Sequence, residues 1–363
     1  MDFTLNTIIG KIPEWVQAFS IFLLAFIITH ISIPPIVKIA RHKGVFDTPN
    51  ERTSHNNEIP ILGGIAIFAG LSVSLIICAW LLNNISIIYI IGGIIVIFLV
   101  GLKDDVFILD PWKKFIGQII ASSFVILLGN IRLTNFYGCF GLAELSYIPS
   151  ILFTLFLFLT LINGFNLIDG VDGLASGTGL FSGLSLFIWF IINGNSAFSF
   201  VSISLIGVLL SYFIYNVFGK VNKIFMGDTG AMITGLMISV NIVEFLEFNK
   251  SQQLRFSIDS APAVAISLVM LPLFDTLRVF VIRILNGKSP FKADKQHIHH
   301  LLLSLGLSHI KVTAILLSFN ALLLLIVYIC RSVNCIILIF LEFLIALISS
   351  LLLTLVVARK NHQ

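Results

Sequence analysis

Long apolar segments separated by short polar ones run along the whole chain. The apolar segments lie at about 15–39, 59–82, 86–102, 113–129, 148–166, 174–193, 197–218, 228–247, 260–283, 312–330 and 335–357. Most have the roughly 20 residues that an α-helix needs to cross a bilayer. They lack the alternation of apolar and polar positions that is typical of membrane β-strands. The pattern predicts an all-α, polytopic membrane bundle of about eleven helices, with residues 1–363 forming a single domain.

The composition supports a membrane protein. Hydrophobic residues make up 58% of the chain and charged residues 11%, and the mean hydropathy is +1.04. Soluble domains have about 45–50% apolar and about 25% charged residues. The four cysteines and the net charge of +4 over 363 residues exclude a disulfide-rich scaffold and give no indication of a nucleic-acid partner.

Lysine and arginine residues are distributed unevenly between the two sides of the predicted bundle. Most of the 22 fall in alternate connections, at positions 41, 43, 52, 103, 113, 114, 220, 223, 283, 288, 292, 295, 311, 359 and 360. Because basic residues favour the cytoplasmic side, we expect the N-terminus outside and the C-terminus inside. The polar clusters then fall in cytoplasmic loops at about 40–58, 103–114, 163–173, 219–230 and 284–311.

The outer connections contain few residues suited to chemistry. Residues 131–146 combine β-forming residues with a central Gly138, which predicts a small extracytoplasmic hairpin. Cys139 is alone in this loop, and the other three cysteines lie in or beside predicted spans. We therefore predict no metal or redox motif among the cysteines.

The first polar cluster is Lys103-Asp104-Asp105, at the cytoplasmic end of the third predicted span. Adjacent helical residues point about 100° apart, so we expect one carboxylate to act and the other to orient it. Paired acids suit a divalent cation or a general base. A charged flank of a span is the simpler alternative.

The second cluster reads Asn163-Gly-Phe-Asn166-Leu-Ile-Asp169-Gly170-Val-Asp172-Gly173. At a spacing of three residues, the first three polar side chains share one broad helical face. The two glycines then allow the backbone to turn. This spacing predicts a polar cradle of amides and carboxylates at the lipid boundary, whereas a simple loop would explain only the glycines.

The third cluster, from Phe225 to Gly230, begins a predicted span whose N-terminus points to the cytoplasm. A helix N-terminus can hold a phosphate, and Asp228 could hold a metal ion that bridges to it. The alternative is that Asp228 and Thr229 only cap the helix.

The fourth cluster extends from Lys288 to His300 and contains His297, His299 and His300. It has neither the local cysteines nor the His-Glu-x-x-His spacing of common zinc sites. The neighbouring lysines favour an anionic ligand such as a diphosphate, and a solvated loop is the alternative. A fifth feature, Asp275 with Arg278 inside a predicted span, must face protein or a watery cleft, as an ion pair or as part of a site.

Together the clusters offer carboxylates, amides, lysines and histidines, but no evident serine or cysteine nucleophile. Carboxylates that hold Mg²⁺ and cations that hold phosphates are typical of phosphoryl transfer. The residues alone therefore predict a membrane phosphotransferase with a cytoplasmic phosphorylated donor and a lipid acceptor.

The segments GLKDD, NGFNLIDGVDGLA, FMGDTG and SPFKADKQHIHH, in this order, resemble the polyprenyl-phosphate N-acetylhexosamine-1-phosphate transferases of glycosyltransferase family 4. The resemblance runs from about Gly44 to Gly306. It is strongest to the branch that acts on UDP-GlcNAc and undecaprenyl phosphate. The muramoyl-pentapeptide branch usually has three consecutive histidines where this chain has His297-Ile298-His299-His300.

The resemblance implies transfer of GlcNAc-1-phosphate from UDP-GlcNAc to undecaprenyl phosphate with release of UMP. This is the first lipid-linked step of a surface polysaccharide such as O-antigen. It also implies a divalent cofactor, Mg²⁺ or alternatively Mn²⁺. The expected location is the bacterial inner membrane, with the active site facing the cytoplasm. A homodimer is one possible oligomeric state.

Matched position by position, the resemblance makes Asp228 the metal ligand with Asn166 beside it, and Asp104 and Asp105 the acidic catalytic pair. Phe225 resembles the aromatic residue that stacks on uracil, and Asp172 a nucleoside contact. The remaining substrate-binding candidates are Asp47, Lys114, Asn163, Asp169, Arg283, His297, His299 and His300. The alternatives are the same reaction with another UDP-N-acetyl sugar or UDP-MurNAc-pentapeptide, or a transporter of a nucleotide sugar or polyprenyl lipid.

Overall fold

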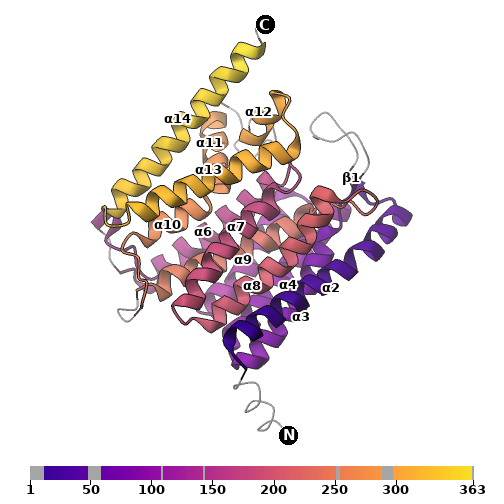
Figure 1. The fold of residues 1–363 in the computed structure, drawn as a ribbon, viewed down its shortest axis with the longest axis horizontal. Helices are drawn as coiled ribbons and strands as arrows, with labels where there is room; N and C mark the ends of the chain where they lie inside the picture. The colour runs from indigo at the N-terminus through magenta and orange to yellow at the C-terminus, as the bar shows by residue number, and fades with distance from the viewer. Residues whose placement is uncertain are drawn as a thin grey trace.

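The computed structural model describes residues 12–47, 59–107, 109–141, 144–250, 254–285, 287 and 297–361, and in these ranges the chain is a bundle of helices (Figure 1). The α-helices are α2 Glu14–Lys43, α3 Gly63–Leu82, α4 Ile85–Phe107, α5 Pro111–Ser123, α6 Tyr147–Ile168, α7 Leu174–Ile192, α8 Ser196–Phe213, α9 Gly227–Phe248, α10 Ala261–Leu268, α11 Met270–Leu285, α12 Ile298–Ser304, α13 His309–Ile329 and α14 Cys335–Asn361. The π-helical turns η1 Phe124–Leu128 and η3 Ile214–Phe218 follow α5 and α8, and η2 Cys139–Gly141 is a 3₁₀ turn. The polytopic helical fold predicted from the sequence is confirmed.

The core of the bundle is centred on α9. In its most apolar stretch 83% of the residues are buried, against 22% for α14 at the periphery. In Figure 1, α13 and α14 cover one side of the bundle, and α2 and α3 cover the other. Small residues permit the close packing of α9. A Cβ atom on Gly101 of α4 would lie 2.5 Å from the Thr229 Cα atom, so these two helices approach more closely than a larger residue at that position would allow.

The structure refines the predicted number of spans. Nine helices in the described ranges are long and apolar enough to cross a membrane, and a bent pair, α10 and α11, makes ten. The remaining predicted span, 113–129, is the 13-residue α5 continued by the five residues of η1. Lys114, at the start of α5, contacts Asp228, and the segment after η1 forms hydrogen bonds to residues in the first turns of α6. The other end of α6 lies beside Asp228 again. The unit of α5 and η1 therefore runs from one end of the bundle to the other and makes its eleventh passage.

The tenth passage is broken. The axes of α10 and α11 differ by 77° at Val269. A helix break frees backbone carbonyls that lipid cannot satisfy. Here the Ser182 hydroxyl donates to the Leu268 carbonyl at 2.7 Å, which satisfies one of them.

Two short β features accompany the helices. Strands β1 Phe46–Asp47 and β2 Ile59–Pro60 pair antiparallel, with Asp47 opposite Ile59, and the sequence pattern did not predict them. At the other end of the bundle, Asn135 and Glu144 form a single antiparallel bridge, as expected for a hairpin within 131–146.

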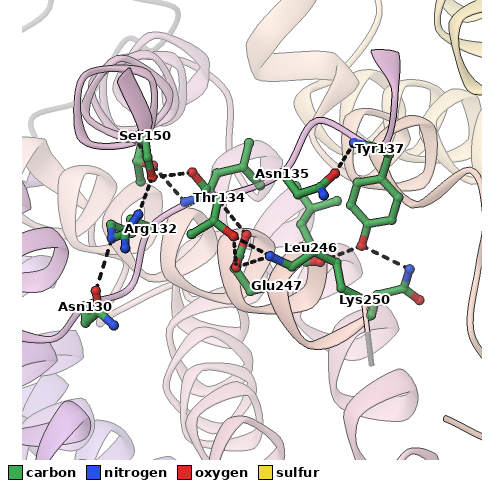
Figure 2. Close-up of polar contacts among 12 residues, drawn as sticks. Asn130, Arg132, Thr134, Asn135, Tyr137, Ser150, Leu246, Glu247 and Lys250 are labelled. Atoms are coloured by element: carbon green, nitrogen blue, oxygen red, sulfur yellow. Dashed lines mark hydrogen bonds and ion pairs between the residues drawn. The ribbon is translucent and has the colours of Figure 1, made fainter. Parts of the chain in front are cut away.

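The loop that contains this bridge is bound firmly to α6 and α9 (Figure 2). Arg132 donates to the Ser150 hydroxyl at 3.0 Å. The Thr134 amide donates to Glu247 at 2.7 Å, and the Tyr137 hydroxyl donates to the Leu246 carbonyl at 2.5 Å. These bonds fix the loop against the C-terminal end of α9, a whole helix length from Asp228.

Candidate active site

Two carboxylates and a lysine from three helices meet at one end of the bundle. The Lys114 ammonium of α5 lies 2.6 Å from Asp228 of α9 and 2.9 Å from Asp104 of α4. The Asp228 side chain is 36% exposed, whereas that of Asp104 is 8% exposed. Asp228 is therefore the carboxylate that a ligand can reach, with Asp104 behind Lys114.

Asp105, the neighbour of Asp104, holds the first turn of α9. Its carboxylate accepts hydrogen bonds from the Asp228 amide at 2.7 Å and from the Thr229 amide at 3.2 Å and hydroxyl at 2.6 Å. Gly227, with a φ of +68°, brings the chain close to this carboxylate, and a Cβ atom there would lie 2.7 Å from it. The two adjacent acids thus have different partners, as their geometry predicted.

The first turn of α9 bears on the prediction that a phosphate could bind there. The Asp228 and Thr229 amides already bond to the Asp105 carboxylate of α4. A phosphate at this N-terminus stays a prediction and would depend on the other amides of the first turn, on side chains or on a metal ion.

The end of α6 adds an amide and a further carboxylate. Asn166 donates to Asp228 at 2.7 Å, and so helps to fix its orientation. Asp169 is the C-cap residue of α6. Burial, with added repulsion from Asp228 and Asp105, raises the pKa of Asp169 well above its usual value. The cluster therefore contains more carboxylate charge than its cations balance.

Asn163 has a different environment from its two neighbours on the same face. Its amide donates to Gln118 of α5 at 2.8 Å and to the Leu159 carbonyl at 2.7 Å. Gln118 in turn donates to Asn163 at 3.2 Å. This reciprocal amide pair joins α5 to α6, so the contacts of Asn163 in this structure are interhelical.

Lys223 joins Asp172 to Phe225, because it contacts both side chains. The Lys223 ammonium is 2.6 Å from Asp172 and 5.9 Å from the centre of the Phe225 ring. Burial alone would raise the pKa of Asp172, but His309 and Lys223 lower it by more, so the net shift is downward and the carboxylate is ionised. Its Oδ1 atom is buried and has no hydrogen-bond donor among the described residues.

The backbone around Phe225 is fixed by the segment that contains β2. The Phe225 amide donates to the Pro60 carbonyl at 2.8 Å, and the Gly63 amide donates to the Phe225 carbonyl at 2.9 Å. Asp47 belongs to the paired strand β1, and its side chain lies outside the described residues. Lys288 and Lys292 of the fourth cluster also lie outside them.

The histidines reach the site through α11 and α12. His297 lies 3.0 Å from Asp275, whose other oxygen accepts the Ile298 amide at 2.9 Å. Arg278 is 3.9 Å from the same carboxylate, so Asp275 and Arg278 form the predicted ion pair. Asp275 thus also anchors the segment that contains the histidines. His299 lies against the turn after α6. Its Nε2 atom is 3.0 Å from the position that a Cβ atom on Gly170 would occupy.

The three histidines differ in their surroundings. His299 stacks 5.6 Å from His297 and lies 4.3 Å from His300, measured between ring centres. Burial, with the nearby His300, lowers the pKa of His299 to about 3. His299 is therefore neutral near pH 7 and offers hydrogen bonds, not positive charge, to an anionic ligand. Arg283 is buried near the end of α11.

The residues present suit a magnesium ion that shares its ligands with a substrate. No three His, Cys, Asp or Glu side chains in the described ranges form a complete metal-binding group. Mg²⁺ usually binds proteins through one or two carboxylates together with substrate phosphates and water. The partly exposed Asp228, with the Asn166 amide beside it in a cluster rich in carboxylates, fits that mode.

Some residues of the site were not singled out from the sequence as ligands. Lys223, Thr229, Gln118 and His309 all contact predicted site residues. Thr229 lies within a recognised segment and was considered only as a cap of the helix, and Lys223 lies two residues before that segment. Gln118 and His309 contact the site through the packing of α5 and α13, for which the local sequence gives no indication.

An all-helical bundle with a cluster of carboxylates and lysines at one end is the architecture of a multi-pass membrane enzyme. A model of glycosyl transferase family 4 matches residues 87–246, which include α4 to α9 and the residues around Asp228. The chain is 31% identical over 311 residues to the decaprenyl-phosphate N-acetylglucosaminephosphotransferase of Mycolicibacterium smegmatis, covering 79% of this chain and 75% of the relative.

Two further relatives agree with this match. The undecaprenyl-phosphate alpha-N-acetylglucosaminyl 1-phosphate transferase of Salmonella typhi is 29% identical over 294 residues, 80% of this chain and 77% of the relative. The protein of the same name from Escherichia coli K12 is 27% identical over 274 residues, 74% and 72% of the two chains. The chain belongs to glycosyl transferase family 4, and the resemblance seen in its motifs is confirmed.

Replacement of Asp105 with alanine should destabilise the protein and reduce its activity. The change removes three hydrogen bonds at the start of α9, and loss of a helix cap costs about 0.5–2 kcal/mol. We expect a lower melting temperature in detergent, and impaired turnover because Asp228 is the next residue. Asp110→Ala is the control, since the Asp110 side chain is exposed and makes no capping hydrogen bond to α5. Equal melting temperatures for the two variants would contradict this role.

His299 should make stability depend on pH. Its pKa is about 3 in the folded protein and 6.5 in the unfolded chain, so below pH 6.5 the unfolded state binds the extra proton. Stability should therefore fall as pH decreases, by about 2 kcal/mol from this residue between pH 7 and pH 5. Thermal unfolding at several pH values should show a smaller acid loss in His299→Gln than in the wild type. The exposed His42→Gln should behave as wild type, and an unchanged slope in His299→Gln would refute the assignment.

Proposed function

We propose that the protein transfers GlcNAc-1-phosphate from UDP-GlcNAc to undecaprenyl phosphate and releases UMP, at the cytoplasmic face of a bacterial inner membrane. The main support is the cluster of Asp228, Lys114 and Asp104 at one end of a membrane bundle. The named activities of the family relatives and the distribution of basic residues support the substrates and the orientation. The product would begin a lipid-linked surface polysaccharide such as O-antigen.

The nucleoside end of the donor fits the region of Phe225 and Asp172. The half-buried Phe225 ring offers a face for uracil to stack on. The Asp172 side chain, which is 14% exposed, would accept a hydrogen bond from the base or ribose. Lys223 holds Asp172 in place and can approach the diphosphate from the same side.

The diphosphate and sugar would lie between this region and the histidines. Neutral His299 can donate a hydrogen bond to a phosphate or sugar oxygen, and Arg283 supplies a permanent charge. Asp228 and Asn166 would hold Mg²⁺, with Mn²⁺ as the alternative, and the bound ion would neutralise the phosphates of the donor. Lys114 adds a second positive charge directly beside Asp228.

The reaction would be a direct displacement. An oxygen of the lipid phosphate attacks the β-phosphorus of the donor, and the bond to the UMP oxygen breaks in line with it. A phosphate monoester has a second pKa of about 6 and is largely ionised at pH 7. A strong base is therefore unnecessary, and Asp104 would act by positioning Lys114.

A transporter for the same ligands is the alternative class. Transporters place their binding groups near the middle of the membrane. In the described residues, the charged groups beside Asp228 lie at the ends of α4, α6 and α9. This placement favours an enzyme that works at the surface of the bilayer.

A panel of donors tests the function directly. Purified protein with undecaprenyl phosphate and Mg²⁺ should release UMP from UDP-GlcNAc faster than from UDP-GalNAc, UDP-glucose or UDP-MurNAc-pentapeptide. Omission of the lipid should abolish release. A preference for another donor would change the assigned sugar, and no UMP from any donor would favour transport.

Asp228 and Asp104 should respond differently to removal of charge. Asp228→Asn should lower turnover on the order of 10³-fold, because it alters the exposed metal-binding carboxylate. Asp104→Asn should also impair turnover but leave UDP-GlcNAc binding measurable by calorimetry, because Asp104 lies behind Lys114. Similar loss of donor binding in the two variants would contradict this division of roles.

A further inference from the structure

A cavity of about 900 Å³ lies at the end of the bundle opposite Asp228. Its walls come from residues 132–147, from Asn249 and Lys250 directly after α9, and from residues 257–259 before α10. All but two of the residues that line it, Leu145 and Ile258, have polar side chains. The volume is typical of small-molecule sites, which span about 300–1,000 Å³, and the polar lining indicates a polar ligand.

Hydrogen bonds hold the walls of this cavity in place. Within the loop, the Leu145 amide donates to the Thr134 carbonyl at 2.8 Å, and Thr134 itself bonds to Glu247 of α9 (Figure 2). The Asn249 side chain donates to the Ile258 carbonyl at 2.8 Å and accepts the Ile258 amide at 2.9 Å. The loop and the segment before α10 are therefore both anchored to the end of α9, and the protein alone shapes the cavity.

Arg132 lines the cavity and forms no ion pair with the described acidic residues. It donates to the Asn130 side-chain oxygen at 3.1 Å and to the Ser150 hydroxyl at 3.0 Å, and both acceptors are neutral groups (Figure 2). Its guanidinium carbon lies 4.8 Å from the centre of the Tyr147 ring. These contacts orient a guanidinium group whose remaining N–H donors suit a phosphate.

Two carboxylates line the same cavity. Glu144 and Asp259 are both exposed, and in the described part of the chain neither forms an ion pair with Arg132 or Lys250. Lys250 is paired instead with Glu247, at 2.5 Å. Opposite charges therefore lie around one cavity without contacting each other. A ligand that carries both a negative and a positive group can meet both.

The cavity lies beside a surface that faces lipid. Tyr147, the first residue of α6, is exposed, and tyrosines are typical of the boundary between lipid and water. Ile148, Leu152 and Phe156 follow at spacings of four residues and are all exposed, so they form one apolar strip along α6. A molecule whose polar end occupies the cavity can extend apolar chains along this strip. This arrangement favours a lipid over a soluble ligand.

We propose that the cavity binds the headgroup of a zwitterionic phospholipid of the phosphoethanolamine type. The phosphate bonds to Arg132, and the ammonium group bonds to Glu144 and Asp259. The acyl chains follow the apolar strip of α6. Because the cavity is at the end of the bundle remote from Asp228, the inference does not rest on the proposed reaction.

Titration with defined lipids tests the headgroup. The full chain in detergent is titrated with phosphatidylethanolamine or with phosphatidylglycerol of the same acyl chains, and native mass spectrometry measures the bound lipid. Both lipids have the phosphate, but only the first has the ammonium group. We expect phosphatidylethanolamine to bind about tenfold more tightly, because it alone makes charge-assisted hydrogen bonds to the carboxylates. Equal affinities would overturn the proposal.

Two substitutions separate the contacts of the headgroup. Arg132→Gln should weaken the binding of both lipids about tenfold, because both use the phosphate contact. Asp259→Asn should weaken only phosphatidylethanolamine. Asp259 is exposed, so its substitution tests the proposal even where loss of the Arg132 bonds to Ser150 and Asn130 destabilises the loop. Melting temperatures check that each variant is folded, and unchanged binding in folded Asp259→Asn would overturn the proposed contacts.

Arg331→Gln is the matched control. Arg331 follows α13 and lies 4.7 Å from the Tyr328 ring centre, much as Arg132 lies over Tyr147, but it is outside the cavity. Its substitution should leave both affinities unchanged. A loss equal to that of Arg132→Gln would indicate nonspecific contact with lipid and overturn the site.

A soluble headgroup distinguishes a lipid from a free solute. Glycerophosphoethanolamine has the same charged groups without acyl chains. At the same concentration as the lipid, it should leave phosphatidylethanolamine bound, because it makes no contact with the strip on α6. Displacement of the lipid would show that the cavity takes a free solute and would overturn the lipid assignment.

Discussion

The carboxylate of Asp105 fixes the first turn of α9, and the geometry of the site depends on this contact. It bonds to the amides of the two residues at which α9 begins, so α4 cannot shift without displacing Asp228. The adjacent Asp104 points in another direction and pairs with Lys114. The adjacent residues Asp104 and Asp105 therefore join α4 to α9 and set the position of Lys114. Since two amides in the first turn of α9 already bond to Asp105, the phosphate groups of the proposed donor would depend largely on side chains and a metal ion.

The charges of the site suit the proposed ligand, which would bring both phosphate and a divalent cation. Lys114 and Lys223 each pair with a carboxylate, while burial, with repulsion from the neighbouring carboxylates, raises the pKa of Asp169. Such a cluster of buried charges costs stability. The proposed magnesium–nucleotide complex would relieve this cost, because its cation would meet the carboxylates and its phosphates would meet the lysines. The same imbalance of charge would therefore favour binding of the proposed donor.

The sequence predicted the helical membrane fold, and it singled out polar residues that the structure brings together, because charged residues in an apolar chain have few places to lie. Asp104, Asp228 and Asn166 were identified from motifs and meet in the structure. The role of Gln118 could not be inferred, since it depends on how α5 packs against α6. Local spacing predicts the groups within an element, and packing decides which elements meet.

The break between α10 and α11 has a consequence for the histidines. The break turns the axis by 77° at Val269, so α11 runs in a direction that a continuous helix would not take. Beyond this break, Asp275 holds both His297 and the first amide of α12. The angle at Val269 therefore helps to set where the imidazoles lie. The position of His299 against Gly170 depends in this way on the packing of the helices around the break, including the bond from Ser182 to Leu268.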